Sequence, residues 1–191
     1  DLTFTTGTGS AEASMVFTGT MTDINAALEG MSFNPTANYS GPATVQIATN
    51  DQGNIGSGGA LSDDDTVSIT VNPVNDPPIF TSGPLTFVDE DSAYGYSIAT
   101  SDVDGDALIL TAPTLPSWIS FSDNGNGAGT LSGTPTNSEV GTHEVTLQVS
   151  DGTVQVDQTF TVTVFNTNDA PEFTSTAVTS VNEDSLYSYS I

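Results

Sequence analysis

Apolar and polar residues alternate along several short segments of the chain. In residues 143–149 the odd positions are predicted to face a core and the even positions water. In residues 159–164 threonine alternates with phenylalanine or valine, and residues 67–71 repeat this pattern. A period of two is typical of β-strands that bury one face. Breaks rich in Gly and Asn, such as residues 123–127, separate these segments, so we predict short strands joined by turns.

One segment departs from this pattern and is predicted to be a short helix. It covers residues 22–31, where Thr22 or Asp23 is positioned to cap the N-terminus. Gly30 is a suitable stop, because glycine readily adopts the left-handed conformation that ends many helices. No other segment of the sequence carries a comparable helical signal.

The chain contains an internal repeat with a constant offset. Asp76 and Asp169 are 93 positions apart, and three segments recur at that spacing. They are residues 75–82, 88–92 and 94–98, which recur as 168–175, 181–185 and 187–191. About seven short strands in each repeat describe a β-sandwich. The predicted fold is therefore all-β, with tandem Ig- or cadherin-like Greek-key sandwiches. Residues 1–76 form one that lacks its first strands, 77–169 form a complete one, and 170–191 are the first strands of a third.

The charge of the chain is unusual and limits the partners that the protein can bind. It has 24 acidic residues, no Lys or Arg, and a formal net charge of −24. Nucleic acids and anionic membranes are excluded as partners, because nothing in the chain could neutralise their phosphates. The chain has no Cys, so disulfides cannot brace it. Such acidity favours a salty, calcium-rich setting, and we expect a secreted or cell-surface protein.

Acidic residues cluster where strands are predicted to end. Asn75–Asp76 recurs as Asn168–Asp169, residues 89–91 recur as 182–184, and residues 102–106 follow the pattern D-x-D-G-D. Asp, Asn and Gly are also ordinary turn residues, so one such cluster alone is more often a turn than a site. The repetition, and the lack of any basic side chain to balance the charge, favour calcium, which binds about six to eight oxygen ligands.

Residues 77–169 resemble the dystroglycan-type cadherin-like domains of bacterial secreted and surface proteins. The resemblance is carried by residues 115–121, 129–137, 140–142 and 150–152. Residues 1–77 resemble a related cadherin-like repeat of giant bacterial adhesins. There the matching segments are residues 17–20, 24–28, 33–35, 38–41 and 50–51.

This resemblance implies calcium bound between successive sandwiches. At the first junction the implied ligands are Asn75, Asp76, Asp102, Asp104 and Asp151. At the next junction they are Glu90, Asn168 and Asp169. The family's mid-domain D-R-E motif has no clean match, since Asn137 and Glu139 lie near the pattern but not on it. Fewer ions per junction than in animal cadherins are therefore expected.

The predicted function is a calcium-stiffened structural or adhesive repeat of a large secreted or cell-surface bacterial protein or extracellular filament. The alternative is a carbohydrate-binding module of a secreted polysaccharide-active protein. In that module the rings that stack on sugars would be those of Trp118, Tyr94, Tyr96 and Tyr39. The simpler interpretation is that these aromatic residues pack within the sandwich. We expect no enzyme, because His143 is the lone histidine and there is no Cys, Lys or Arg.

The expected partners are neighbouring repeats of the same polypeptide or identical chains bound head to tail, with glycans as a further candidate. Residues 170–191 carry only the beginning of a repeat, and a pair of strands alone is not stable in water. We expect these residues to complete a sandwich with another chain or with further sequence.

Overall fold

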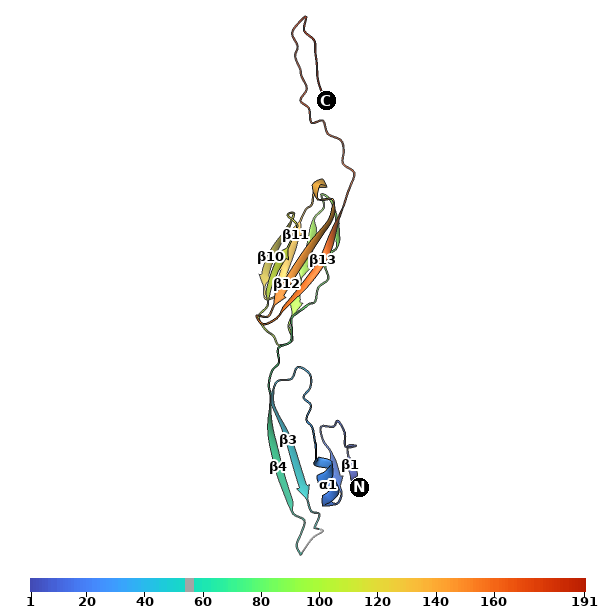
Figure 1. The fold of residues 1–191 in the computed structure, drawn as a ribbon, viewed down its shortest axis with the longest axis vertical. Helices are drawn as coiled ribbons and strands as arrows, with labels where there is room; N and C mark the ends of the chain where they lie inside the picture. The colour runs from blue at the N-terminus through green and yellow to red at the C-terminus, as the bar shows by residue number, and fades with distance from the viewer. Residues whose placement is uncertain (54–56) are drawn as a thin grey trace. The chain divides into compact units, whose positions relative to one another are not determined.

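The computed structural model of the chain describes residues 1–53 and 57–191 (Figure 1). Within these residues the chain divides into an N-terminal unit, Asp1–Val74, and a C-terminal unit, Asn75–Ile191. Each unit is described by itself. Both are built mainly from antiparallel strands, and the predicted all-β class with Ig-like sandwiches is confirmed.

The N-terminal unit consists of two hairpin-like strand pairs and one helix. Strands β1 (Thr3–Thr6) and β2 (Val16–Thr18) pair antiparallel, as do β3 (Gly41–Asn50) and β4 (Ser62–Val71). Helix α1 (Met21–Leu28) lies between these pairs in the sequence.

The helix begins earlier than the sequence predicted. Thr20, rather than Thr22 or Asp23, is the N-cap, because its hydroxyl accepts a hydrogen bond from the Asp23 N–H at 3.2 Å. Asp23 then lies in the first turn, where its negative charge favours the helix N-terminus. The helix ends at Leu28, just before Gly30, which adopts a positive φ of 77°.

The side chains of the N-terminal unit are only partly covered. None of the described residues in 1–74 is buried. The inward positions of β3 and β4, such as Val45, Ile47 and Ile69, are half-buried, and Val67 is 51% exposed. The two strand pairs therefore leave much of an apolar face accessible.

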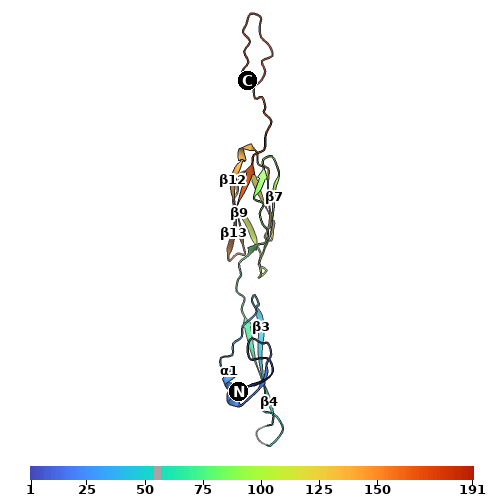
Figure 2. The ribbon, with the colours of Figure 1, turned by 90° about the vertical axis from the view of Figure 1, so that its right-hand side faces the viewer.

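The C-terminal unit contains a closed β-sandwich. One sheet has the order β10-β11-β7, the other has the order β6-β13-β12-β9, and β5 and β8 form a short extra pair. Figure 2 shows β7 on one side of this sandwich and β12 and β13 on the other. The element bounds are β5 (Ile79–Phe80), β6 (Phe87–Asp89), β7 (Tyr94–Ile98), β8 (Thr100–Ser101), β9 (Ile109–Thr114), β10 (Ile119–Gly125), β11 (Ala128–Gly133), the 3-10 helix η1 (Asn137–Glu139), β12 (Gly141–Ser150) and β13 (Gln155–Phe165).

The core of the sandwich is made by the alternating positions that the sequence indicated. Val145, Leu147 and Val149 of β12 are fully buried, and Val162 of β13 is too. Leu131 of β11 closes the core from the opposite sheet. Burying an aliphatic side chain of this kind contributes about 1.5–3 kcal/mol, so these positions dominate the stability of the domain.

Tyr94 packs in this core and is expected to ionise late. Its side chain is 2% exposed, and its hydroxyl donates to the Leu85 carbonyl at 2.8 Å. Burial, aided by the neighbouring Tyr96, raises the pKa of Tyr94 to about 12. A raised pKa favours the protonated form, so the contribution of Tyr94 to stability is lost as pH rises from 10 toward 12.

Absorbance at the tyrosinate band, followed as pH is raised, should show one late ionisation phase that is missing in Tyr94→Phe. A late phase that persists unchanged in Tyr94→Phe would contradict the assignment.

Candidate calcium site

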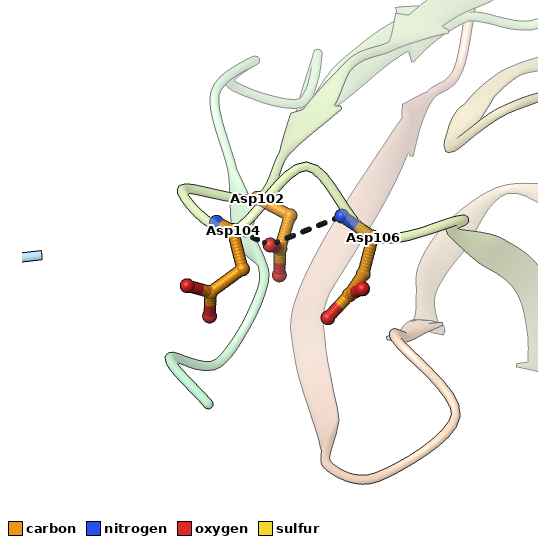
Figure 3. A group of neighbouring side chains, drawn as sticks. All are labelled: Asp102, Asp104 and Asp106. Atoms are coloured by element: carbon orange, nitrogen blue, oxygen red, sulfur yellow. Dashed lines mark hydrogen bonds between the residues drawn. The ribbon is translucent and has the colours of Figure 1, made fainter. Parts of the chain in front are cut away.

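The loop between β8 and β9 brings three carboxylates together at one end of the sandwich. Asp102 Oδ1 accepts hydrogen bonds from the backbone N–H groups of Asp104 at 2.8 Å and Gly105 at 3.1 Å. Gly105 has a φ of 80°, which few other residues adopt without strain, so it allows the tight turn. As a result Asp102, Asp104 and Asp106 each offer one oxygen, and these oxygens lie within 4.8 Å of one another (Figure 3).

Two residues that precede the sandwich are tied to the same end. The backbone N–H of Asp76 donates to Asp104 Oδ2 at 2.7 Å. The side-chain amide of Asn75 donates to Asp151 Oδ2 at 2.9 Å. Hydrogen bonds therefore link Asn75 to Asp151 and Asp76 to Asp104, but the carboxylates of Asp76 and Asp151 are not part of the group whose oxygens lie within 4.8 Å of one another.

Asp151 is held in the turn between β12 and β13. Its Oδ1 accepts from the N–H groups of Val154 at 2.6 Å and Thr153 at 2.7 Å. The hydrogen bond from Val154 and the one from Asn75 lower the pKa of Asp151 below its ordinary value of 3.8. This carboxylate therefore stays ionised into acidic solution.

One oxygen of the cluster lacks a partner. Asp102 Oδ2 is buried and has no hydrogen-bond donor among the described atoms. Since the chain has no Lys or Arg, no basic side chain can compensate this charge. A buried carboxylate oxygen that has no hydrogen-bond partner is unfavourable. The side chains of the cluster offer only carboxylate oxygens as metal ligands. Such ligands fit a hard divalent cation such as calcium.

A second polar group surrounds Glu90, which follows β6. The Glu90 side chain is 1% exposed, and its Oε1 accepts from the Thr167 N–H at 2.6 Å and the Asn166 amide at 2.8 Å. Its Oε2 is buried without a partner among the described atoms. Nearby in the sequence, Asp169 accepts a hydrogen bond from the Asn137 amide at 3.3 Å, and Asn168 is exposed.

The ligand set implied by sequence omits residues that the structure adds to these groups. Asp106 belongs to the same D-x-D-G-D segment, but the resemblance extends only to its first two aspartates. Asn166 and Thr167 precede the repeated Asn-Asp pair by two positions and one position, respectively, and only the return of β13 toward β6 reveals that they contact Glu90. The sequence alone does not predict which distant strands pair, and therefore does not predict these contacts.

The aromatic residues considered as stacking faces pack mostly inside the domain. Trp118 makes edge-to-face contacts with Tyr94 at 5.6 Å and with His143 at 5.8 Å between ring centroids. Tyr94 and Tyr96 are buried. His143 Nε2 lies 2.6 Å from the Glu139 carbonyl oxygen. These contacts match the packing interpretation of these side chains, while Tyr39 is 43% exposed.

Comparison with known proteins identifies one protein family and several relatives. Residues 77–165 match the family described as "Putative Ig domain". The chain is 31% identical over 144 residues to the serine-rich adhesin for platelets of Staphylococcus aureus strain MRSA252. This alignment covers 70% of this chain and 10% of the adhesin. The same adhesin of strain MW2 gives 31% identity with 6% of that protein covered. The chain thus spans a tenth or less of the length of these relatives.

Several solved structures are also similar. The endo-fucoidan hydrolase MfFcnA4 of glycoside hydrolase family 107 is 28% identical with a TM-score of 0.44, over 70% of this chain and 20% of that one. The SrpA adhesin of Streptococcus sanguinis is 14% identical with a TM-score of 0.41, over 49% and 59%. Human protocadherin-24 EC1-2 is 22% identical with a TM-score of 0.37, over 48% and 44%.

The family match and the sandwich topology agree with each other. Among the described residues, no helix combines the length and apolarity needed to cross a bilayer. The narrower cadherin-like assignment stays a prediction, as does the calcium. Residues 77–165 of this chain form an Ig-like domain.

Proposed function

We propose that this chain is a calcium-stiffened structural or adhesive repeat of a secreted or cell-surface bacterial protein. The similarity to a staphylococcal adhesin supports the adhesive setting, since adhesins act outside the cell. The Ig-like match over residues 77–165 and the recurrence of sequence segments at an offset of 93 positions support a tandem repeat of such a protein. Its partners are then neighbouring repeats or the surface to which the parent protein adheres.

The observation that carries the proposal is the buried Asp102 Oδ2, which has no hydrogen-bond partner among the described residues, in a chain without Lys or Arg. Around it, Asp104 and Asp106 add two further carboxylates within 4.8 Å. Repulsion among these charges opposes the folded loop. A divalent cation would relieve that repulsion, and the chain has no Lys or Arg side chain to do so.

Each residue of the group has a separate part in this proposal. Asp102, Asp104 and Asp106 would hold calcium, which supplies the positive charge that the chain lacks. Asn75 and Asp76 already bond to Asp151 and Asp104, so an ion in the loop would also fix the segment that leads into the domain. A fixed linker loses much of its bending freedom, and the tandem array becomes stiffer.

Calcium titration of the protein by calorimetry tests the binding step. Asp102→Asn keeps the Oδ1 acceptor of the turn and removes the charge, so we expect binding to weaken by about tenfold or more. Asp123→Asn is a matched control. Asp123 Oδ1 also closes a turn, accepting from the Gly125 N–H at 2.9 Å, but Asp123 is outside the cluster. Equal calcium affinity in the two variants would refute the site.

Small-angle scattering tests the stiffening step. We expect the wild-type chain to give a sharper, more extended distance distribution in calcium than in chelator, and Asp102→Asn to give the chelator profile in both. A wild-type scattering profile that is the same in calcium and in chelator would overturn the mechanical role even if calcium binds.

A further inference from the structure

The segment that leads into the Ig-like domain contains a peptide bond with unusual chemistry. Asp76 is followed by Pro77, and this is the only Asp-Pro pair in the sequence. At the equivalent position, 93 residues later, Asp169 is followed by Ala170. A bond to proline is a tertiary amide, and breaking it releases a secondary amine. The proline nitrogen accepts the proton that it needs as a leaving group more readily than an ordinary amide nitrogen does.

The carboxylate of Asp76 is available to attack that bond. The Asp76 side chain is half-buried, and no hydrogen bond among the described residues reaches its carboxylate oxygens. Its backbone is held instead, because the Asp76 N–H donates to Asp104 Oδ2 at 2.7 Å. Attack of this carboxylate on the carbonyl carbon of the same residue closes a five-membered ring. Two groups held together in this way react as if each were present at very high concentration.

A hydrogen-bond donor already lies on the carbonyl oxygen of this bond. The side-chain amide of Asn75 donates to the Asp76 carbonyl oxygen at 3.3 Å and to Asp151 Oδ2 at 2.9 Å. Since Asp151 is fixed in the turn between β12 and β13, the fold of the domain positions the Asn75 amide. Attack at the carbonyl carbon places negative charge on its oxygen, and a donor that is in place beforehand stabilises that charge.

The other side of the bond is arranged so that cleavage leaves the domain intact. Pro77 is exposed, so solvent reaches its nitrogen. Pro78 is fully buried, and β5 begins only at Ile79, so every strand of the Ig-like domain lies after the bond. Pro77 also lines one cleft with Asp102. The amine released at Pro77 is positively charged near neutral pH, and it would lie close to a carboxylate in a chain without Lys or Arg.

We propose that the bond between Asp76 and Pro77 is a self-cleavage site that separates residues 1–76 from the Ig-like domain. One carboxylate oxygen of Asp76 bonds to the carbonyl carbon of the same residue. The C–N bond to Pro77 then breaks, its electron pair stays on the proline nitrogen, and that nitrogen takes a proton from solvent. Asp76 is left as a cyclic anhydride. One water molecule opens the anhydride to two carboxyl groups, which lose their protons to solvent.

The net reaction is the hydrolysis of one peptide bond, and water is its only other reactant. Asp76 is the catalytic residue, Asn75 stabilises the charge on the carbonyl oxygen, and Asp151 is a positioning residue that orients Asn75. No step uses a metal ion. The tests below are therefore run in chelator, so that their outcome does not depend on whether calcium binds to the domain.

Incubation of the full chain in mildly acidic buffer of one fixed pH is the first test. We expect mass spectrometry to find two fragments, residues 1–76 and 77–191, that accumulate with time. The rate should not change with protein concentration, because the reacting groups belong to one residue. The emission of Trp118, the single tryptophan, shows whether the Ig-like domain stays folded throughout.

Two variants separate the parts of the site. Asp76→Asn keeps the backbone N–H that Asp104 holds and removes the nucleophile, so cleavage should slow by about a hundredfold or more. Asn75→Ala removes the donor on the carbonyl oxygen and keeps the nucleophile, so cleavage should slow by about tenfold or more. Trp118 emission again reports whether each variant is folded.

Ala170→Pro supplies a matched bond in the same molecule. It creates a second Asp-Pro pair, after Asp169, whose Oδ2 accepts a hydrogen bond from the Asn137 amide at 3.3 Å. Among the described residues no side-chain amide donates to the Asp169 carbonyl oxygen. In the folded protein the bond after Asp76 should therefore break about tenfold faster than the new bond. In concentrated urea, where neither carbonyl oxygen has a positioned donor, the two bonds should break at the same rate.

Three outcomes would overturn the proposal. One is equal cleavage of the two bonds in folded Ala170→Pro, which would mean that the fold adds nothing to the ordinary reactivity of an Asp-Pro bond. Another is a bond after Asp76 that breaks in urea but stays intact in the folded chain. The third is cleavage that proceeds as fast in Asp76→Asn as in the wild type, which would point to a contaminating protease.

Discussion

Gly133→Ala is expected to destabilise the Ig-like domain by about 3 kcal/mol or more, whereas Gly95→Ala should change its stability by about 0.5 kcal/mol or less. A Cβ on Gly133 would lie 2.1 Å from the Trp118 carbonyl oxygen and 3.1 Å from the carbonyl carbon. These are backbone atoms, so relief requires the strands themselves to move. Gly95, on the neighbouring strand, has no atom within 4 Å of an added Cβ.

Urea unfolding followed by tryptophan fluorescence measures this difference. Trp118 is the single tryptophan of the chain, so its emission reports on the Ig-like domain alone. The two glycines lie side by side in the same sheet, with Gly95 opposite Ser132 and Gly133 opposite Tyr94. Similar midpoints for the two variants would show that the close approach of Gly133 to Trp118 does not constrain the fold.

Removal of calcium is expected to lower the free energy of unfolding of the same domain. A site filled at a hundred times its Kd contributes about 2.7 kcal/mol, and chelation removes that contribution. The urea midpoint read from Trp118 should fall on chelation in the wild type and in Asp123→Asn, but much less in Asp102→Asn. An unchanged wild-type midpoint would mean that the loop tolerates its charge without an ion.

The acid limit of the turn between β12 and β13 follows from Asp151. Its pKa is lowered by the hydrogen bonds from Val154 and Asn75, so its contribution to stability is complete above its unfolded value and is lost as pH falls through the folded one. The turn that holds Asn75 should therefore persist at pH values somewhat below the ordinary aspartate pKa of 3.8.

The sequence predicted the strands of the Ig-like domain well because burial there follows the period of two. Val145, Leu147 and Val149 alternate with polar residues, and all three are fully buried. The same pattern at Val67 led to a strand but not to a buried side chain, since Val67 is 51% exposed. Periodicity specifies which face turns inward. Whether that face is covered depends on a partner strand, which the pattern does not encode.

The candidate site was predictable to a similar extent. Asp102, Asp104 and Asp151 could be named because their motifs are local and the resemblance relates them. The hydrogen bond from Asn75 to Asp151 joins residues 76 positions apart, so its existence depends on how the sandwich closes. Glu90 is the clearest case, because neither its burial nor its bond to Thr167 can be inferred from residues near it in the sequence.

In four turns of this protein, one carboxylate oxygen of an aspartate holds the backbone. Asp51, Asp102, Asp123 and Asp151 all accept backbone N–H groups through Oδ1. Asparagine performs the same task at Asn50, whose Oδ1 accepts from the Gln52 N–H at 2.7 Å. Amide and acid are thus interchangeable for holding the backbone. Replacing these aspartates with asparagine should therefore lower the net negative charge of the protein while the turns keep their backbone hydrogen bonds.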